Sequence, residues 1–413
     1  MMNQLESTSH PNSTTLAKLF RHSVLITVFA IIVSVINVVY SETASGDQGS
    51  KNTIWLTPNG DDANSGKSVT NGVASGKRAA ELASPGSRIV VAEGRYSPLR
   101  FEGLKGSESA PILIEAQNRS EGSESGTVVS SGNFKGGTGL TLVKCQHVIL
   151  SGFEVTKTQK GIGVHSCSHC IIKDNWLHDL GQEAIHVGRG PTNSGDNPFT
   201  GPESHHVRVA NNKISSTGKS IAIYGEGIYI GTGAIRGDHS HDIVVEDNVL
   251  TDISAEAIEL KPGTYNLIVR GNKISNTHHE YNAAITVCVE GTTSNNGNYL
   301  IENNVIRDIK KVRYGVAGIA IGHGNAIIRN NQISDIDGGI GIQVYRRFQN
   351  EDALKVELTN NTVRANGAGD SITLHYGNCG LKDSPLKANV SLRDNQTDDA
   401  SAGTVVHTQS TPK

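Results

Sequence analysis

Three glutamates recur at one position of a short repeated motif. The segments QEAIHVG, GEGIYIG and AEAIELK align on their isoleucine, which brings Glu183, Glu226 and Glu256 into register. If successive repeats stack as strands about 4.8 Å apart, the three carboxylates repel one another unless shared protons or a cation relieve them. Carboxylate oxygens are the ligands that Ca²⁺ prefers. The column therefore predicts either a Ca²⁺ site or a turn position at which each glutamate caps backbone N–H groups.

Two further positions of this motif carry groups that could act on a substrate, and we expect both columns to point outward. One column holds His186, Tyr229, Glu259 and Thr286, and the other holds Gly188, Gly231, Lys261 and Cys288. Lys261 is the most informative residue, because a long cationic side chain there interrupts a column of glycines. Since an outward lysine adds little stability, Lys261→Ala is expected to leave the melting temperature nearly unchanged.

General-base chemistry at Lys261 would require a neutral amine. A lysine with its usual pKa of about 10.4 is protonated at pH 7, and lowering that pKa to ~8 costs about 3 kcal/mol. Glu256 and Glu259 oppose this shift, whereas a bound Ca²⁺ would reverse the local field. The residues thus predict a base and a metal site together.

An asparagine repeat indicates the element that positions these residues. Eight segments such as CIIKDNWL, IVVEDNVL and AIIRNNQI align on Asn175, Asn212, Asn248, Asn272, Asn304, Asn331, Asn361 and Asn395. The spacing varies between 24 and 37 residues, and apolar residues alternate before each asparagine, which is typical of strands rather than of a helical repeat. A second short strand follows in each unit. The pattern predicts an all-β, right-handed parallel β-helix of about eight or nine coils, with the asparagines hydrogen-bonded in an internal ladder.

The N-terminal segment predicts export. An apolar run, residues 23–40, follows a polar start, and its length suits a signal-peptide core better than a membrane span. Small side chains favour cleavage after Ser41, which gives an extracellular or periplasmic protein; only an uncleaved leader would keep it at the membrane. The expected division is 1–41 signal peptide or signal anchor, 42–52 linker, 53–140 N-terminal cap and first irregular coils, 141–378 regular coils, and 379–413 last coil and tail.

Two other columns follow from the register. Four neighbouring coils alternate in charge two positions before the asparagine and predict a solvated charge ladder, formed by Glu246, Arg270, Glu302 and Arg329. Cys145 and Cys167 lie one coil apart, within the Cα range of a disulfide. The segment CSHC, with histidines nearby, would also suit a metal clip, but buried or paired cysteine is the commoner outcome for a single CxxC.

Composition excludes other classes of protein. Aromatic residues make up 5% and glycine 46 of 413 residues, which argues against a helical bundle and favours a β-rich fold with many turns. The 37 basic and 40 acidic residues give a net charge of −3, so no basic field exists to hold nucleic acid. An acidic partner would have to be held locally or through a metal.

Two stretches resemble known families. The opening from IWLTPNGDDANSGKS to APILIEA resembles that of secreted, pectate lyase-like β-helix proteins, which implies a short N-terminal capping helix. The stretch EAIELKPGTYNLIVRGN, with Glu256 five residues before Lys261 and Asn266 five after, resembles the chondroitinase B and alginate lyase branch of the polysaccharide lyases. That resemblance implies a calcium ligand at Glu256 and a general base at Lys261.

One feature of that branch is missing. The matching strand of the next coil reads NAAITVCVE and lacks the branch's Arg-His-Gly, so the catalytic acid is open among Arg236, Tyr229 and His186. Glu259 and Thr286 are expected to contact substrate.

Three functions are compatible with these residues. The leading expectation is a secreted, monomeric, calcium-assisted lyase of an acidic, uronate-containing polysaccharide such as pectate, alginate or a glycosaminoglycan. A non-catalytic carbohydrate-binding or surface-structural β-helix is the second, and a glycoside hydrolase or uronate epimerase is the third. Release of an unsaturated uronate product distinguishes the first from the other two.

Overall fold

Parallel strands dominate the chain. The computed structural model describes residues 52–118, 126–190, 201–232, 238–279, 283–287, 297–311, 317–322, 324–337, 340–345, 354–364, 372–375, 388–397 and 405–407. The chain divides into two units, Met1–Ser50 and Lys51–Lys413, and every described residue lies in the second. The predictions for the leader, Arg236, Cys288 and Cys379 lie outside the described residues. Of the helices in these ranges, none has the length and hydrophobicity that a membrane span requires.

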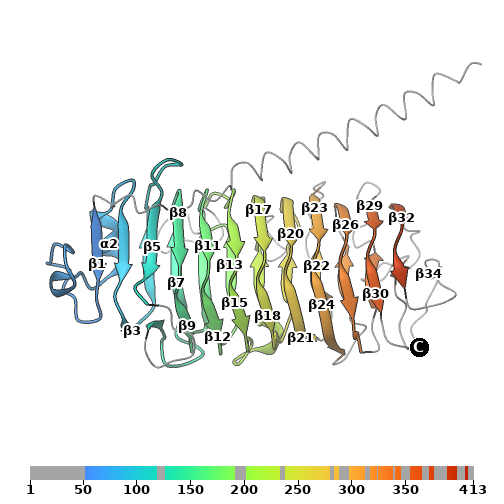
Figure 1. Ribbon diagram of the computed structural model, residues 1–413, viewed down its shortest axis with the longest axis horizontal. Coiled ribbons are helices and arrows are strands. Elements are labelled where there is room, and N and C mark those ends of the chain that lie inside the picture. Colours follow the sequence, from blue (N-terminus) through green and yellow to red (C-terminus); the bar gives the residue numbers. More distant parts are fainter. Residues whose placement is uncertain are drawn as a thin grey trace, which may run out of the picture. The chain divides into compact units, whose positions relative to one another are not determined.

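Strands of successive coils pair in parallel and form three sheets (Figure 1). Sheet A contains β1 (Thr53–Leu56), β2 (Arg88–Val91), β5 (Ile112–Ala116), β8 (Val148–Ser151), β11 (Ile171–Lys173), β14 (Arg208–Ala210), β17 (His241–Glu246), β20 (Tyr265–Arg270), β23 (Asn298–Glu302), β26 (Asn325–Arg329), β29 (Leu354–Thr359) and β32 (Ala388–Arg393). Sheet B contains β3 (Gly94–Tyr96), β6 (Thr127–Val129), β9 (Glu154–Thr156), β12 (Trp176–His178), β15 (Lys213–Ser215), β18 (Val249–Thr251), β21 (Lys273–His279), β24 (Val305–Lys311), β27 (Gln332–Ser334), β30 (Thr362–Arg364) and β33 (Gln396–Thr397).

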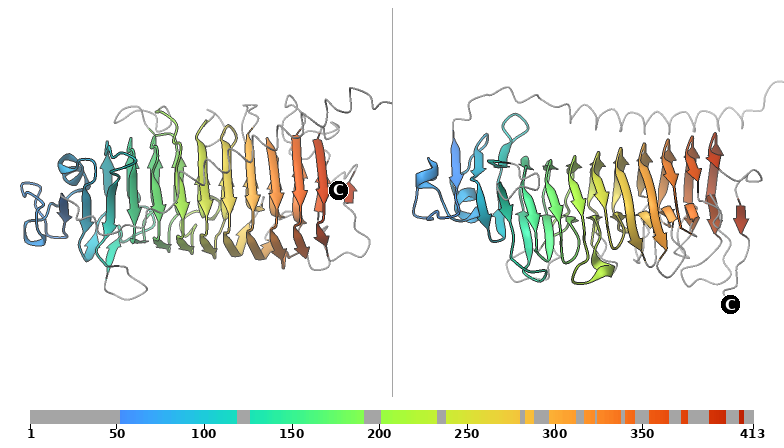
Figure 2. Two further views of the ribbon diagram at one scale, coloured as in Figure 1. Left: turned by 45° about the horizontal axis from the view of Figure 1, so that its top comes forward. Right: turned by 60° about the horizontal axis from the view of Figure 1, so that its bottom comes forward.

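Sheet C carries the repeated glutamate motif. It contains β4 (Leu99–Glu102), β7 (Thr138–Val143), β10 (Lys160–His165), β13 (Ile185–Gly188), β16 (Ile228–Ile230), β19 (Ile258–Leu260), β22 (Ala283–Val287), β25 (Ala317–Ile321), β28 (Ile340–Tyr345), β31 (Ile372–His375) and β34 (Val405–His407). Figure 2 shows from two further sides that the strands follow one another along the stack in chain order. The predicted right-handed parallel β-helix is confirmed.

The coils differ from the sequence-based expectation in two details. Each complete coil has three strands rather than two, because the few residues after each asparagine form the separate strands of sheet B. Sheet A has 12 strands, more than the eight or nine coils expected. The first coils were expected only as irregular coils within residues 53–140 and were not counted, because they lack the asparagine: Phe153 takes the ladder position in the coil before Asn175, and its backbone N–H donates to Asn175 Oδ1 at 3.1 Å.

The asparagine ladder is present as predicted. From Asn212 to Asn395, each Oδ1 accepts from the backbone N–H and the side-chain amide of the asparagine one coil earlier, at 2.9–3.1 Å. The residue before each ladder asparagine has a positive φ of 54–65°, and it is always Asp, Asn or Gly. These residues tolerate the left-handed conformation best, so the pair of residues makes the turn from sheet A to sheet B.

Apolar side chains fill the inside of the stack. Isoleucine, valine and leucine from all three sheets form one continuous buried cluster, which includes Ile185, Ile228 and Ile258 of sheet C. Burial of these side chains supplies the main favourable free energy of folding. The core therefore holds sheet C rigidly, and the polar residues that alternate with its isoleucines face the other way.

A short helix lies at the beginning of the stack, as the N-terminal resemblance implied. This helix, α2 (Gly76–Leu82), is capped by Ser75, whose hydroxyl accepts from Arg78 N at 3.1 Å. Two single-turn 3₁₀ helices, η1 (Val69–Asn71) and η2 (Ala222–Tyr224), complete the described helices.

The charge ladder is confirmed in register but is less solvated than expected. Glu246, Arg270, Glu302 and Arg329 pair in successive strands of sheet A. Glu246 is only 3% exposed and accepts from Arg208 and from Arg270, the latter at 2.6 Å. The carboxylates lie beneath the arginines, so each pair is more sheltered than a surface ion pair.

The cysteines do not form the suggested disulfide. Cys145, Cys167 and Cys170 are free, buried thiols within the hydrophobic core. Cys145 and Cys167 do share one column, since Cys145 N donates to Cys167 Sγ at 3.4 Å, but each thiol donates to a backbone carbonyl instead. Cys167 and Cys170 face the core, so CSHC makes no metal clip within the described residues.

Candidate functional site

The glutamate column forms as the sequence predicts. Backbone N–H groups of Ala184 and Gly227 donate to the carbonyls of Glu226 and Glu256 in the next coil, at 2.9 and 3.0 Å. Small residues beside the glutamates make this close stacking feasible, because a Cβ on Gly227 would lie 2.5 Å from Ala257 O. The strands β13, β16 and β19 then hold the three glutamates on neighbouring coils.

Only two of these three glutamates join a common cluster. Carboxylate oxygens of Glu226, Glu256 and Glu259 all lie within 4.8 Å of one another, and all three residues are buried. Glu259, expected to contact substrate, thus takes the place expected for Glu183. Glu183 forms an ion pair with Lys160 instead, with Nζ and Oε1 2.6 Å apart.

The three carboxylates affect one another's protonation. Burial raises the pKa of Glu226 well above its ordinary value, and the neighbouring Glu259 and Glu256 raise it further. A carboxylate cluster of this kind is relieved by a proton on one member or by a cation. The three oxygen donors fit a hard divalent cation such as Ca²⁺, which takes carboxylate ligands.

Lys261 lies against this cluster and is not the outward lysine that the sequence suggested. Its side chain is 11% exposed, and its Nζ donates to Glu259 Oε1 at 2.6 Å. The ammonium also lies 5.0 Å from the centre of the Tyr229 ring. Gly231 leaves the space for this lysine, because a Cβ there would lie 2.9 Å from Lys261 Cβ.

The surroundings of Lys261 keep it charged. Burial by itself would lower the pKa of the ammonium, but the carboxylates of Glu259, Glu256 and Glu226 outweigh burial and raise that pKa above its ordinary value. Lys261 is therefore an ammonium at neutral pH while Glu259 remains its partner. Removing it would leave a buried carboxylate without its cation, so the expectation of an unchanged melting temperature rested on a wrong premise.

The column that was expected to contact substrate is in register, but its side chains are largely shielded from solvent. His186, Tyr229, Glu259 and Thr286 pair in successive strands, as the alignment predicted. His186 is 7% exposed and Thr286 is fully buried, so alternation away from the core does not make them surface residues. The Thr286 hydroxyl donates to Ala283 O at 3.2 Å, which commits it to the backbone.

A neutral histidine pair continues the site along sheet C. His186 Nε2 donates to Gly231 O at 2.8 Å, and its ring lies edge-on to Tyr229 and His165, with centroids 4.9 and 5.1 Å apart. Burial lowers the pKa of both His165 and His186 to about 3, so both are neutral at pH 7. Burial and the nearby glutamates raise the pKa of Tyr229 far above its ordinary value, which keeps the phenol protonated.

Sequence reasoning missed His165 and Lys160 as members of this face. His165 pairs with Gly188, so it occupies the column of Gly188, Gly231 and Lys261, three coils before Lys261. The signal was present in the segment KGIGVHS, which belongs to the same series of second strands. Aligning that segment with the glutamate motifs would have placed both residues.

The fold is shared with carbohydrate-active enzymes of known structure. An alginate lyase from Paenibacillus sp. str. FPU-7 superposes with a TM-score of 0.55 and 22% identity, over 86% of this chain and 97% of the lyase. The chain has a polysaccharide-lyase-like fold. A GH136 lacto-N-biosidase from Eubacterium ramulus also superposes, with a TM-score of 0.51 and 12% identity, over 84% of this chain and 68% of that protein. Because both enzymes share the fold, the fold alone does not select a reaction.

Comparisons of sequence add little to this. No known protein-family profile matches the chain. The uncharacterized protein YwoF of Bacillus subtilis (strain 168) is 25% identical over 152 residues, which is 34% of this chain. The match spans about a third of that relative's length, 32%.

Proposed function

We propose that this chain is a secreted lyase that cleaves a uronate-containing polysaccharide by β-elimination. The observation that carries the proposal is the convergence of three buried carboxylates, a lysine and a protonated tyrosine on one face of sheet C. The polysaccharide-lyase-like fold supports it. We further propose that the protein acts as a monomer outside the cytoplasm.

β-Elimination needs a base that takes a proton from the sugar ring and an acid that gives a proton to the leaving oxygen. The base removes the proton from carbon 5 of the uronate, the carbon–hydrogen electrons form the double bond between carbons 4 and 5, and the bond from carbon 4 to the glycosidic oxygen breaks. An acid then protonates the departing oxygen. Positive charge beside the uronate carboxylate stabilises the enolate-like intermediate.

The residues can be assigned to these roles. Lys261 is the proposed base, and it becomes neutral only when Glu259 no longer holds its ammonium. Tyr229 is the proposed acid, because its raised pKa keeps the phenolic proton available near that lysine. His186 orients Tyr229 through their edge-on contact and is the alternative acid.

The carboxylates provide a reason for Lys261 to change its protonation state. Glu226, Glu256 and Glu259 are the proposed Ca²⁺ ligands, and the ion would contribute positive charge that neutralises both the ligands and the uronate carboxylate. With Glu259 engaged as a ligand, Lys261 would lose the partner that raises its pKa. Glu183 is left out of this ligand set because it pairs with Lys160.

Product formation on a panel of polymers tests the proposal. Incubation with pectate, alginate or chondroitin sulfate should produce the ultraviolet absorbance of an unsaturated uronate, and a chelator should suppress it. Lys261→Arg should reduce the rate at least about 100-fold, because arginine keeps the charge pair with Glu259 but cannot serve as a base. Lys160→Arg is the matched control and should retain the rate, since Lys160 also pairs with a sheet C glutamate but takes no catalytic role.

The outcomes separate the parts of the proposal. Full activity of Lys261→Arg would refute Lys261 as the base, and activity that is indifferent to chelator would refute the metal. Sugar turnover without the absorbance would point to a hydrolase or an epimerase.

A non-catalytic β-helix is the second candidate, and one observation favours it. The charged groups of this face already neutralise one another in the pairs Lys160–Glu183 and Lys261–Glu259, which a structural role alone would explain. Binding of a uronate polymer without any release of product would support this candidate.

A further inference from the structure

Histidines gather where the chain passes from sheet C into the first residues of the sheet A strands. His147, His169, His206 and Asp242 occupy the same turn position in successive coils, and all four have a positive φ of 50–56°. The left-handed conformation is uncommon for residues other than glycine, but asparagine, aspartate and histidine adopt it more often than the rest, so these residue types suit the position. Stacked rings connect the coils, with centroids of His147 and His169 4.6 Å apart, as are those of His169 and His206.

A second histidine column lies directly beside the first. His205 and His241 are bridged in parallel, and their rings stack with centroids 5.2 Å apart at an angle of 7°. His205 Nδ1 lies 2.9 Å from His206 Nδ1, so one ring must donate and the other accept. The two columns therefore bring several imidazole nitrogens to one edge of the stack.

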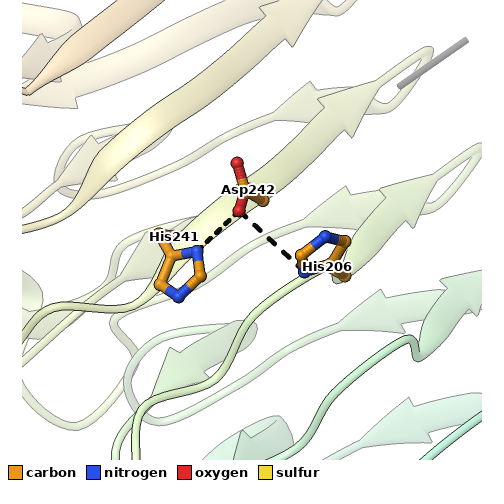
Figure 3. A group of neighbouring side chains, drawn as sticks. All are labelled: His206, His241 and Asp242. Atoms are coloured by element: carbon orange, nitrogen blue, oxygen red, sulfur yellow. Dashed lines mark hydrogen bonds and ion pairs between the residues drawn. The ribbon is translucent and has the colours of Figure 1, made fainter. Parts of the chain in front are cut away.

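Two of these imidazoles converge on a carboxylate. Figure 3 shows His206 and His241 on either side of Asp242, with both rings turned toward its carboxylate. His241 Nδ1 lies 2.6 Å from Asp242 Oδ2, and His206 Nδ1 lies 3.9 Å from the same oxygen. The three side chains are half-buried, with exposed fractions of 24%, 39% and 21% for His241, His206 and Asp242.

We propose that His206, His241 and Asp242 bind a divalent transition-metal ion of the Zn²⁺ class. Two imidazole nitrogens and one carboxylate oxygen are a three-ligand set of the kind that leaves a fourth position open. Ligand atoms about 2.0–2.1 Å from a tetrahedral ion lie roughly 3.4 Å from one another, a value between the two separations observed here. The ion would replace the proton that His241 and Asp242 now share, and it would displace the hydrogen bond between His205 Nδ1 and His206 Nδ1.

A neighbouring side-chain amide holds the carboxylate in a fixed orientation. Asn266 Nδ2 donates to Asp242 Oδ1 at 3.2 Å and so holds the carboxylate with its other oxygen toward the histidines.

The chain contains its own control for this arrangement. Asp252 has the same left-handed conformation, with a φ of 53°, and accepts from the Asn276 amide one coil later, as Asp242 does from Asn266. No histidine contacts Asp252 among the interactions of the described residues. The two turns thus differ in their imidazoles and not in their backbone.

Equilibrium dialysis of the full chain, without a histidine tag, against Zn²⁺ tests the proposal, and Co²⁺ serves as a spectroscopic probe. Wild-type protein should retain Zn²⁺ that excess Ca²⁺ does not displace, because Ca²⁺ prefers oxygen ligands. His241→Ala and Asp242→Asn should each weaken Zn²⁺ binding at least tenfold and abolish the Co²⁺ visible absorption. Asp252→Asn, and His278→Ala for an exposed histidine elsewhere, should leave binding within about twofold of wild type.

Three outcomes would overturn the proposal. The first is wild-type protein that retains no Zn²⁺, and the second is His241→Ala that binds as tightly as wild type. The third is loss of binding in His205→Ala together with full binding in His206→Ala, which would refute these ligands. Circular dichroism of each variant shows that a loss of binding does not come from a loss of fold.

Discussion

The protonation of Lys261 and Glu226 is decided by their nearest neighbours. Glu259 and Lys261 are two residues apart on one extended segment, so their side chains leave it on the same face and meet. Among the described residues, Lys261 forms its ion pair with Glu259 and not with Glu226. The pKa of Glu226 is raised, and so is the pKa of Lys261. In the absence of a metal, the favoured state is thus one proton on Glu226 and one on Lys261.

Glu226→Gln should stabilise the metal-free protein at high pH. A carboxyl group with a raised pKa in the folded state contributes its full stability below its unfolded pKa of about 4.3 and loses it as the pH rises through the folded value. Glutamine stays neutral, so the variant should unfold at higher urea than wild type at pH 8 and at nearly the same urea at pH 4.

Glu183→Gln is the control for that comparison, because Glu183 has Lys160 as its partner and should gain nothing at pH 8. Added Ca²⁺ should make wild type more stable to urea than Glu226→Gln. The wild-type site has one more anionic ligand, and its free energy of unfolding rises by RT ln(1 + [Ca²⁺]/Kd). A variant that is less stable than wild type at pH 8 in chelator would contradict the raised pKa.

At the scale of the element, the ladder asparagines connect each coil to both of its neighbours. Asn272 accepts from Asn248 N and Nδ2 and donates to Asn304 Oδ1 and Val245 O, at 3.0–3.1 Å. A buried backbone N–H without a partner costs about 1–3 kcal/mol, so the side chain is needed wherever the ladder is buried.

Asn272→Ala should lower the free energy of unfolding by about 1–3 kcal/mol, because it leaves the buried Asn248 N–H without its acceptor. Asn395→Ala is the control: it is the last ladder asparagine of the described residues and is only partly buried, so its loss should cost less. Urea unfolding of both variants measures the difference. Equal, negligible losses would mean that water or the backbone replaces the ladder.

At the scale of the whole β-helix unit, each coil pairs only with the coil before and the coil after. The strand order within every sheet is strictly sequential along the stack. Stability in such a solenoid is approximately a sum of terms for each coil and for each interface between neighbours, so the coils at an end can open without the centre.

Amide hydrogen exchange should therefore be slowest in the middle of the stack. The N–H groups of Asn212, Asn248 and Asn272 should exchange more slowly than that of Asn361, whose partner Asn395 lies in the turn after β32, the last strand of sheet A. The measurement is exchange at neutral pH followed by mass spectrometry of peptides. Equal protection along the ladder would show instead that the unit opens all at once.

The sequence by itself determined the fold and the columns. In a parallel stack, each side chain meets the residue at the same position one coil away, so a local repeat also specifies the register between strands. The asparagine ladder, the alternating charges and the column of Glu183, Glu226 and Glu256 could all be read this way. The short strands of sheet B were missed, and the first coils were expected only as irregular coils, because no distinctive residue marks them.

The burial and the partners of each column became visible only in three dimensions. Alternation predicts that Lys261 and Thr286 turn away from the core, but it does not predict that they are covered, nor that Glu259 rather than Glu183 joins the carboxylate cluster. The register of His206 and Asp242 was available in the sequence, because each lies six residues before a ladder asparagine, Asn212 or Asn248. The convergence of these two side chains with His241 was not. Burial and side-chain direction are set by packing across coils, which a one-dimensional pattern does not contain.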